Sequence, residues 1–281
     1  MRNILLPLLS IILGFFLSLF ILKTYINKAL DKKSKKETNT KIKVLKTANT
    51  VKNIGADNIQ KNFESWNIYN KQNIDLMSTY TSLDNKGAVI DKGMFLTLLR
   101  TGAYIAVKSE YKNTIQYKLV SIDDDADQKI KKTISSKATI AYQYFKMEGK
   151  KLPNYNFIDL KGDSYNKEDT KGKIVVLKCW FITCKSCVEE FPELNKLVER
   201  YKNDNIKFIS LAFDEKDKLI EFLKTKVFNY ITIPNQKKYM AKKLKVKQYP
   251  THLIIDSNGI IIKMVNNANT LSTELERILG K

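Results

Sequence analysis

The chain has 281 residues, of which 43% are hydrophobic and 10% aromatic, so it can build folded cores and is not a disordered protein. Lysine and arginine outnumber aspartate and glutamate by 49 to 29, which gives a net charge of +20. Arginine contributes to this charge only at Arg2, Arg100, Arg200 and Arg277. Proteins that read nucleic acids depend on arginine for bidentate contacts, and here the lysines are spread along the whole chain. We therefore expect no nucleic-acid partner.

An uncharged apolar run opens the chain. Ile4 to Leu22 are nineteen residues without a charge, which in a helix span roughly 28 Å, close to the thickness of the hydrocarbon core of a bilayer. No small-x-small cleavage site follows Leu22, and no cysteine follows it as a lipid attachment point. We expect residues 1–22 to form an uncleaved membrane anchor, with a cleaved signal peptide as the alternative.

Two observations predict opposite orientations for this anchor in the membrane. Residues 23–52 carry ten lysines against two acids, and positive residues next to a membrane span tend to stay in the cytoplasm. The disulfide exchange that we infer below favours a location outside the cytoplasm. We expect export, with the body of the protein in the periplasm or outside the cell, although the flanking charge argues against it.

Composition divides the next part of the chain into three segments. Residues 23–60 are polar and rich in lysine without a sustained period, which is typical of a linker. Residues 61–125 are denser in apolar side chains and predict a small α+β module that contains no motif with recognisable chemistry. Its predicted elements are a strand at Leu76–Leu83, a helix at Gly93–Arg100, and strands at Ala103–Lys108 and Thr114–Val120. Residues 126–150 are predicted to be a connecting helix.

Residues 151–281 alternate between strand and helix patterns. Lys173–Phe181 is a near-continuous apolar run, as expected of a strand that is buried on both faces. Near the end, Thr251–Ile255 and Ile260–Val265 form a predicted hairpin, because the Asn-Gly pair between them supplies positive φ angles. These alternations predict an α/β domain of thioredoxin type, with a central mixed sheet flanked by helices.

Cys184 and Cys187 stand where the predicted central strand gives way to a predicted helix over Lys185–Tyr201. The first sulfur lies at the helix N-terminus, where free N–H groups and the helix dipole favour a thiolate. The second lies one turn later on the same face, close enough to close a disulfide. Since the thiolate is the attacking species in disulfide exchange, this spacing predicts redox chemistry. A zinc ribbon would need a second such pair or a pair of histidines, and the chain has neither.

Three further residues lie near this pair in the predicted fold. Pro250 immediately precedes a strand, where a cis bond would expose the preceding backbone to an extended substrate. Cys179, on the central strand, is expected to be a small buried hydrophobe. Alternatively, Cys179, Cys184, Cys187 and the single histidine, His252, could compose a Cys3His site, which would make the chain a copper or zinc carrier.

Residues 151 to about 268 resemble the TlpA/ResA group of membrane-tethered thioredoxin-like oxidoreductases. The matching features are the run from Pro153 through Phe157 to Gly162, the Gly172–Leu177 strand, Trp180, the run from Cys184 to Pro192, the Tyr249-Pro250-Thr251 turn and the Asn258-Gly259 hairpin. Residues 61–125 lie outside this resemblance.

The resemblance implies roles for individual residues. Cys184 would be the exposed attacking cysteine, Cys187 the buried cysteine that resolves the mixed disulfide, and Pro250 a cis-proline that faces the pair. Glu190 would carry a proton to or from Cys187, with a pKa that burial raises toward neutrality. Lys178 stands where thioredoxin keeps a buried acid, so the proton route used there is missing.

The predicted function is that of a membrane-anchored thiol-disulfide oxidoreductase. Its expected partners are proteins that carry disulfides or thiols, a membrane thiol reductant, and lipid around the N-terminal helix. We expect no metal and no cofactor other than the redox-active disulfide Cys184–Cys187. Reduction of apocytochrome cysteines before haem attachment is one task of the group, carried over only by analogy. One rival function is that of a peroxide reductase. That class places a threonine three residues before its reactive cysteine, and here Thr183 is directly adjacent to Cys184, which disfavours this function. A further rival function is that of an adaptor, in which residues 61–125 would bind a partner and the redox domain would be ancillary.

Overall fold

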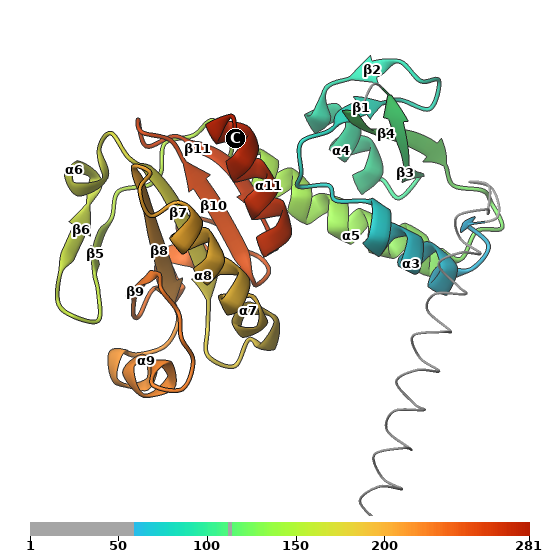
Figure 1. Ribbon diagram of the computed structural model, residues 1–281. Helices are drawn as coiled ribbons and strands as arrows, with labels where there is room; N and C mark the ends of the chain where they lie inside the picture. Colours follow the sequence, from blue (N-terminus) through green and yellow to red (C-terminus); the bar gives the residue numbers. More distant parts are fainter. Residues whose placement is uncertain (1–58, 112–113) are drawn as a thin grey trace, which may run out of the picture. The chain divides into compact units, whose positions relative to one another are not determined.

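The computed structural model describes residues 59–111 and 114–281 (Figure 1). The predicted anchor over residues 1–22 and almost all of the predicted linker lie outside the described residues. The described structure starts at residue 59, so it includes the last two residues of the predicted linker, which was expected to end at residue 60. Gln60 is fully buried, with its amide bonded to the carbonyl of Ser121 and to the N–H of Asp123. None of the helices in these two ranges has both the length and the apolar character that a membrane span requires.

The first half of the described chain folds around a four-stranded sheet with the strand order β2-β1-β4-β3. Its elements are α3 (Phe63–Asn73), β1 (Thr81–Leu83), β2 (Val89–Ile90), α4 (Lys92–Arg100), β3 (Tyr104–Tyr111), β4 (Thr114–Ser121) and α5 (Gln128–Phe145). The pairing of β1 with β4 is parallel and the other pairings are antiparallel. Helix α4 begins where the Asp91 side chain accepts the N–H groups of Gly93 and Met94. It buries Phe95 and Leu99.

The strand predicted over Leu76–Leu83 is largely absent, since only Thr81–Leu83 pairs as β1. The cause is Asp75, whose side chain accepts the N–H of Met77 and whose carbonyl accepts the hydroxyl of Ser78. Such local side-chain bonds offer the backbone a turn in place of a sheet ladder. Helix α3 was not predicted because the side chains that it buries, Trp66 and Asn70, form too weak a pattern.

Helix α5 connects this module to the second half of the chain. Its buried residues Ile130, Ile134, Ala138 and Ala141 recur with the spacing of one helix face. At its end, the buried Tyr144 reaches the second sheet, where its hydroxyl lies 2.8 Å from that of Thr251.

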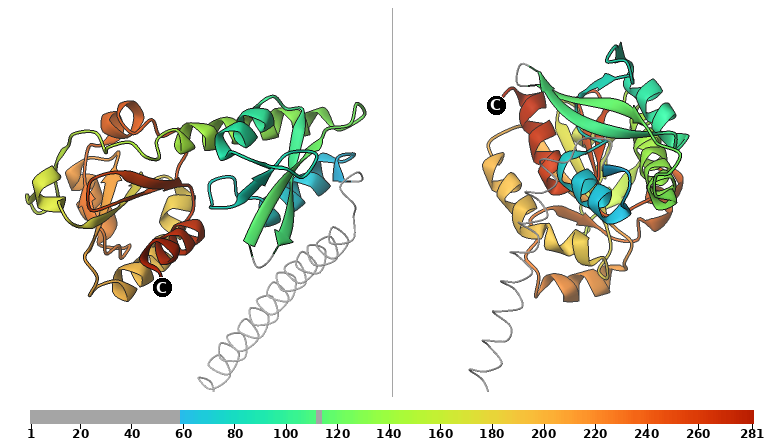
Figure 2. Two further views of the ribbon diagram at one scale, coloured as in Figure 1. Left: turned by 90° about the horizontal axis from the view of Figure 1, so that it is seen from above. Right: turned by 90° about the vertical axis from the view of Figure 1, so that its right-hand side faces the viewer.

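The second half is a thioredoxin-like α/β domain around a five-stranded sheet with the order β11-β10-β7-β8-β9. Its strands are β7 (Ile174–Trp180), β8 (Ile206–Ala212), β9 (Ile231–Ile233), β10 (Thr251–Ile255) and β11 (Ile261–Val265), and a separate hairpin joins β5 (Asn156–Ile158) to β6 (Ser164–Asn166). Its helices are α6 (Lys167–Thr170), α7 (Lys185–Glu189), α8 (Phe191–Arg200), α9 (Lys216–Leu223), α10 (Lys237–Lys242) and α11 (Ala268–Leu279). The central strand β7 pairs with β8 in parallel and with β10 in antiparallel. Helices α8 and α11 contact each other on one face of this sheet (Figure 2).

The helix predicted over Lys185–Tyr201 is divided into α7 and α8. Glu190 ends the first helix and begins the second, and Pro192 occupies the first turn of α8. Proline lacks the N–H that would continue the hydrogen bonding of α7, but it suits the first turn of a new helix. The break at Pro192 therefore divides the predicted helix in two and places Glu190 at the junction.

Candidate active site

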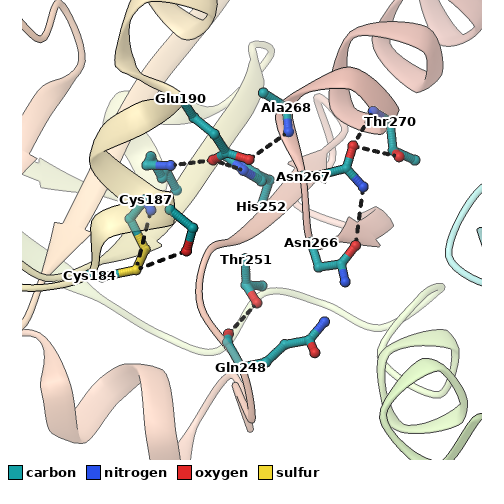
Figure 3. Close-up of polar contacts among 12 residues, drawn as sticks. Cys184, Cys187, Glu190, Gln248, Thr251, His252, Asn266, Asn267, Ala268 and Thr270 are labelled. Carbon is teal, nitrogen blue, oxygen red and sulfur yellow. Dashed lines mark hydrogen bonds and ion pairs between the residues drawn. A yellow bond between two sulfur atoms is a disulfide. The ribbon is translucent and has the colours of Figure 1, made fainter. Parts of the chain in front are cut away.

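A disulfide joins Cys184 to Cys187 at the start of α7 (Figure 3). Cys184 is the N-cap of this helix, and its sulfur accepts the backbone N–H of Cys187 at 3.3 Å. Cys184 retains 7% exposure, whereas Cys187 is fully buried. The structure thus brings the predicted pair together, but Cys184, expected to be exposed, is itself largely buried and is only the more accessible of the two residues. A hydrogen bond to the sulfur of Cys184 would favour its thiolate once the disulfide is reduced.

Aromatic side chains surround the disulfide. Trp180 and Phe191 belong to the same buried cluster as the two cysteines. Tyr249 packs against this cluster from the loop before β10, with its ring centroid 5.5 Å from that of Phe181. The peptide bond from Tyr249 to Pro250 is cis, as predicted, and Pro250 is buried. The loop with the proline and the helix with the cysteines therefore share one apolar cluster.

Glu190 is held between two strands of the sheet. Its Oε2 accepts hydrogen bonds from Lys178 Nζ at 2.7 Å and from His252 Nε2 at 3.0 Å, and its Oε1 accepts the N–H of Ala268 at 2.9 Å (Figure 3). Lys178 on β7 and His252 on β10 are directly opposite each other in the antiparallel ladder, so both side chains leave the same face. Both are fully buried, and 15% of the Glu190 side chain is exposed.

The predicted pKa of Glu190 is wrong in direction. Burial by itself raises the pKa of this carboxyl, but the hydrogen bond and charge of His252 and the charge of Lys178 outweigh burial and lower it to about 2. A carboxylate that accepts several hydrogen bonds beside a cation favours its charged form. Glu190 is thus ionised at neutral pH. The sequence placed Lys178 and His252 on two predicted strands but did not indicate that these strands pair or that both side chains reach this carboxylate.

His252 donates its Nε2–H to Glu190, and its Nδ1 has no hydrogen-bond partner among the residues that the structure describes. Burial, and then the charge of Lys178, lower the pKa of this imidazole, although Glu190 opposes them. The Glu190 carboxylate therefore accepts hydrogen bonds from two basic side chains, Lys178 and His252, which stabilise its charged form.

Cys179 does not join the other cysteines. It is fully buried and unpaired, and burial raises the pKa of its thiol. Successive side chains of a strand leave opposite faces, so Cys179 points away from the face of Lys178 and His252. Within residues 59–111 and 114–281, the side chains of His, Cys, Asp and Glu form no group of three that could hold a metal ion. The alternative of a copper or zinc carrier is therefore not supported.

Comparisons with known proteins place the second half of the chain. The family model described as the AhpC/TSA family matches residues 148–264. The thiol-disulfide oxidoreductase ResA of Bacillus thuringiensis subsp. konkukian (strain 97-27) is 33% identical over 138 residues, which cover 48% of this chain and 79% of that protein. The thioredoxin-like protein YneN of Bacillus subtilis (strain 168) is 31% identical over 117 residues, 41% of this chain and 68% of its own. A solved thiol:disulfide interchange protein from Bacteroides sp. aligns with 48% of this chain and 91% of its own at 23% identity, with a TM-score of 0.43.

The matched region contains both disulfide cysteines, Glu190 and Pro250. The identity to ResA extends over 79% of that protein's length, and this chain carries a disulfide between its two Cys-x-x-Cys cysteines at the start of α7. The chain belongs to the TlpA/ResA-type family of thioredoxin-like thiol-disulfide oxidoreductases.

Proposed function

We propose that this thiol-disulfide oxidoreductase is anchored in the cell membrane by residues 1–22 and acts on extracytoplasmic proteins. The observation that carries its redox function is the Cys184–Cys187 disulfide, in which Cys184 is the less buried residue and its sulfur accepts a backbone N–H. The long apolar run near the N-terminus supports the anchor.

The proposed reaction starts from the reduced enzyme. The Cys184 thiolate attacks one sulfur of a client disulfide, forms a mixed disulfide and releases the first client thiolate. Cys187, as a thiolate, then attacks the sulfur of Cys184, restores the Cys184–Cys187 disulfide and releases the second client thiolate. Two electrons pass to the client, and a membrane thiol reductant would return the enzyme to its dithiol form. Reduced apocytochrome cysteines before haem attachment are one product that fits this direction.

Glu190 is proposed to act as an ionised positioning residue in this reaction. It follows Cys187 by three residues, and His252, which donates to it at 3.0 Å, follows Pro250 by two. This one hydrogen bond connects the junction of α7 and α8, which follows the cysteines, to β10, which follows Pro250. The Lys178 bond fixes the same carboxylate to the central strand. Glu190 would thereby hold the disulfide and the proline loop in one arrangement.

An insulin-reduction assay with dithiothreitol tests the redox function. We expect turbidity to rise with the wild-type chain and not with Cys184→Ser or Cys187→Ser. Cys179→Ala is the matched control, because it removes the third sulfur but leaves the pair, and it should retain activity. Equal inertness of the wild type and both serine variants with every reductant would contradict the proposal.

The proposed location has its own test. In intact cells treated with a reductant, a membrane-impermeant maleimide should label Cys184, and extraction of the chain from membranes should require detergent. Labelling only after cell lysis would overturn the export, and extraction by high salt alone would overturn the anchor.

A further inference from the structure

A polar groove runs between the N-terminal module and the redox domain, next to the proline loop. Its volume is about 490 Å³, which lies in the range of sites that bind ligands. One wall comes from the end of α3, the turn after it and α5, and the other from Gln248, the loop before α11 and the first turn of α11. Its lining includes Asn70, Lys71, Lys137, Gln248, Asn266 and Asn269.

Hydrogen bonds fix the two walls to each other. The Thr270 hydroxyl donates to Asp75 across the groove, and the Glu274 carboxylate accepts both the N–H and the hydroxyl of Thr79. Tyr144 from α5 bonds to Thr251 behind the proline loop. Residues of both halves therefore line one continuous site in the folded chain.

The chemistry of the lining fits a peptide backbone. Amide side chains both donate and accept hydrogen bonds, as peptide groups do. Gln248 Nε2 is a buried donor with no partner among the described residues, and such a group costs free energy until an acceptor reaches it. Asn266 already accepts a bond from Asn267, and Asn70 accepts one from Lys137, so these amides are held in place.

The charge of the lining indicates the side chains that would suit it. Lys71 and Lys137 both face the groove, and Asp75 is its single acid. The carboxylate of Asp75 is already engaged by Thr270 and by the N–H of Met77. A segment with an acidic residue would therefore be favoured over a basic one.

The groove reaches the proline loop, which also packs on the redox site. Gln248 lines it, and the next residue, Tyr249, packs on the cluster that holds both cysteines. In Figure 3 the Gln248 amide extends from the proline loop toward Asn266, away from the disulfide. The groove therefore lies two residues along the chain from Pro250, beside the loop that a client polypeptide is expected to contact.

We propose that this groove binds the extended segment of a client polypeptide next to its target cysteine, with a preference for an acidic residue in that segment. The module before the redox domain is thereby a specificity element, since it supplies one wall. This inference rests on the proposed exchange reaction and names its substrate class more closely.

Synthetic peptides with a single cysteine test the inference. The cysteine is blocked as a mixed disulfide with thionitrobenzoate, whose release is coloured, and is flanked on both sides either by aspartates and serines or by lysines and serines. Hydroxyethyl disulfide serves as a substrate too small to reach the groove. The variants are full-length Lys71→Glu and Gln248→Ala, with Lys132→Glu as the control because Lys132 is an exposed lysine of α5 that does not line the groove.

We expect the wild type and Lys132→Glu to have a higher kcat/KM for the aspartate peptide than for the lysine peptide. Lys71→Glu should reduce this ratio by about fivefold, the effect of one exposed attraction replaced by a repulsion. Gln248→Ala should lower kcat/KM for both peptides about fivefold through KM, relative to hydroxyethyl disulfide.

The inference is overturned if the wild type does not distinguish the peptides, or if Lys132→Glu changes the ratio as much as Lys71→Glu. It is also overturned if Gln248→Ala lowers the rates for the peptides and the small disulfide alike. Failure of the exchange reaction itself is distinguishable, because hydroxyethyl disulfide would then not react either.

Discussion

Replacing Glu190 with glutamine should destabilise the oxidised protein in a way that depends on pH. Glutamine keeps the size of the side chain and removes its charge, so it resembles the protonated carboxyl. Lowering the pKa from an ordinary value of 4.5 to about 2 corresponds to about 3 kcal/mol of stability at pH 7. Removing one partner of a buried ion pair gives a similar figure, about 3 kcal/mol, because the fully buried Lys178 is left without a counter-charge.

The pH dependence follows from the sign of the shift. A carboxyl with a lowered folded-state pKa contributes stability fully above its unfolded pKa of 4.5, and this contribution is lost as the pH falls through about 2. The difference in unfolding free energy between the wild type and Glu190→Gln should therefore decrease from about 3 kcal/mol at pH 7 to about 1.4 kcal/mol at pH 3.

Urea unfolding of the oxidised full-length chain, followed by tryptophan fluorescence, measures this difference. Glu189→Gln is the matched control, because Glu189 is 63% exposed and its pair with Lys185 spans 3.8 Å. We expect the control to change stability by less than about 1 kcal/mol at either pH. A Glu190→Gln difference that stayed below 1 kcal/mol at pH 7, or that grew as the pH fell, would refute the reasoning.

Three further predictions concern the surroundings of the disulfide. Lys178→Met combined with Glu190→Gln should cost less in urea unfolding than Glu190→Gln alone, because the double variant leaves no buried charge unpaired; a larger cost would show that the ion pair is not the source of the effect. Tyr144→Phe removes the hydroxyl that bonds to Thr251 and the nearby backbone, and should lower the unfolding free energy by about 1–2 kcal/mol; an unchanged value would contradict the role of α5 as a support of the loop. Reduced protein should bind no stoichiometric zinc or copper by elemental analysis, and tight binding of one ion that is lost in a His252→Ala variant would restore the metal carrier.

The sequence predicted the α/β fold of the second half because its signals are local. The apolar run that became β7, the hairpin glycine and the cysteine spacing each act over a few residues. The strand predicted from Leu76 failed because a single side chain, Asp75, redirected the backbone into a turn. A composition rich in strand-forming residues does not reveal such a bond.

The candidate site was predictable only in part. The cysteine pair and the cis bond before Pro250 follow from short motifs. The surroundings of Glu190 depend on the register between β7 and β10, which brings Lys178 opposite His252. Burial was expected to raise the pKa of the carboxyl, but Lys178 and His252 lower it. This reversal was not predictable from local sequence, because the two neighbours lie on strands more than seventy residues apart. The groove likewise needs two halves of the chain to be folded together.

The most direct test of the redox account is to trap the mixed disulfide. In a Cys187→Ala variant, the Cys184 thiolate can attack a client but cannot be resolved, so the protein recovered from cells under non-reducing conditions should carry clients that a reductant releases. The same experiment with Cys184→Ala should recover none. Equal capture by both variants, or capture by neither, would contradict attack by Cys184 and resolution by Cys187.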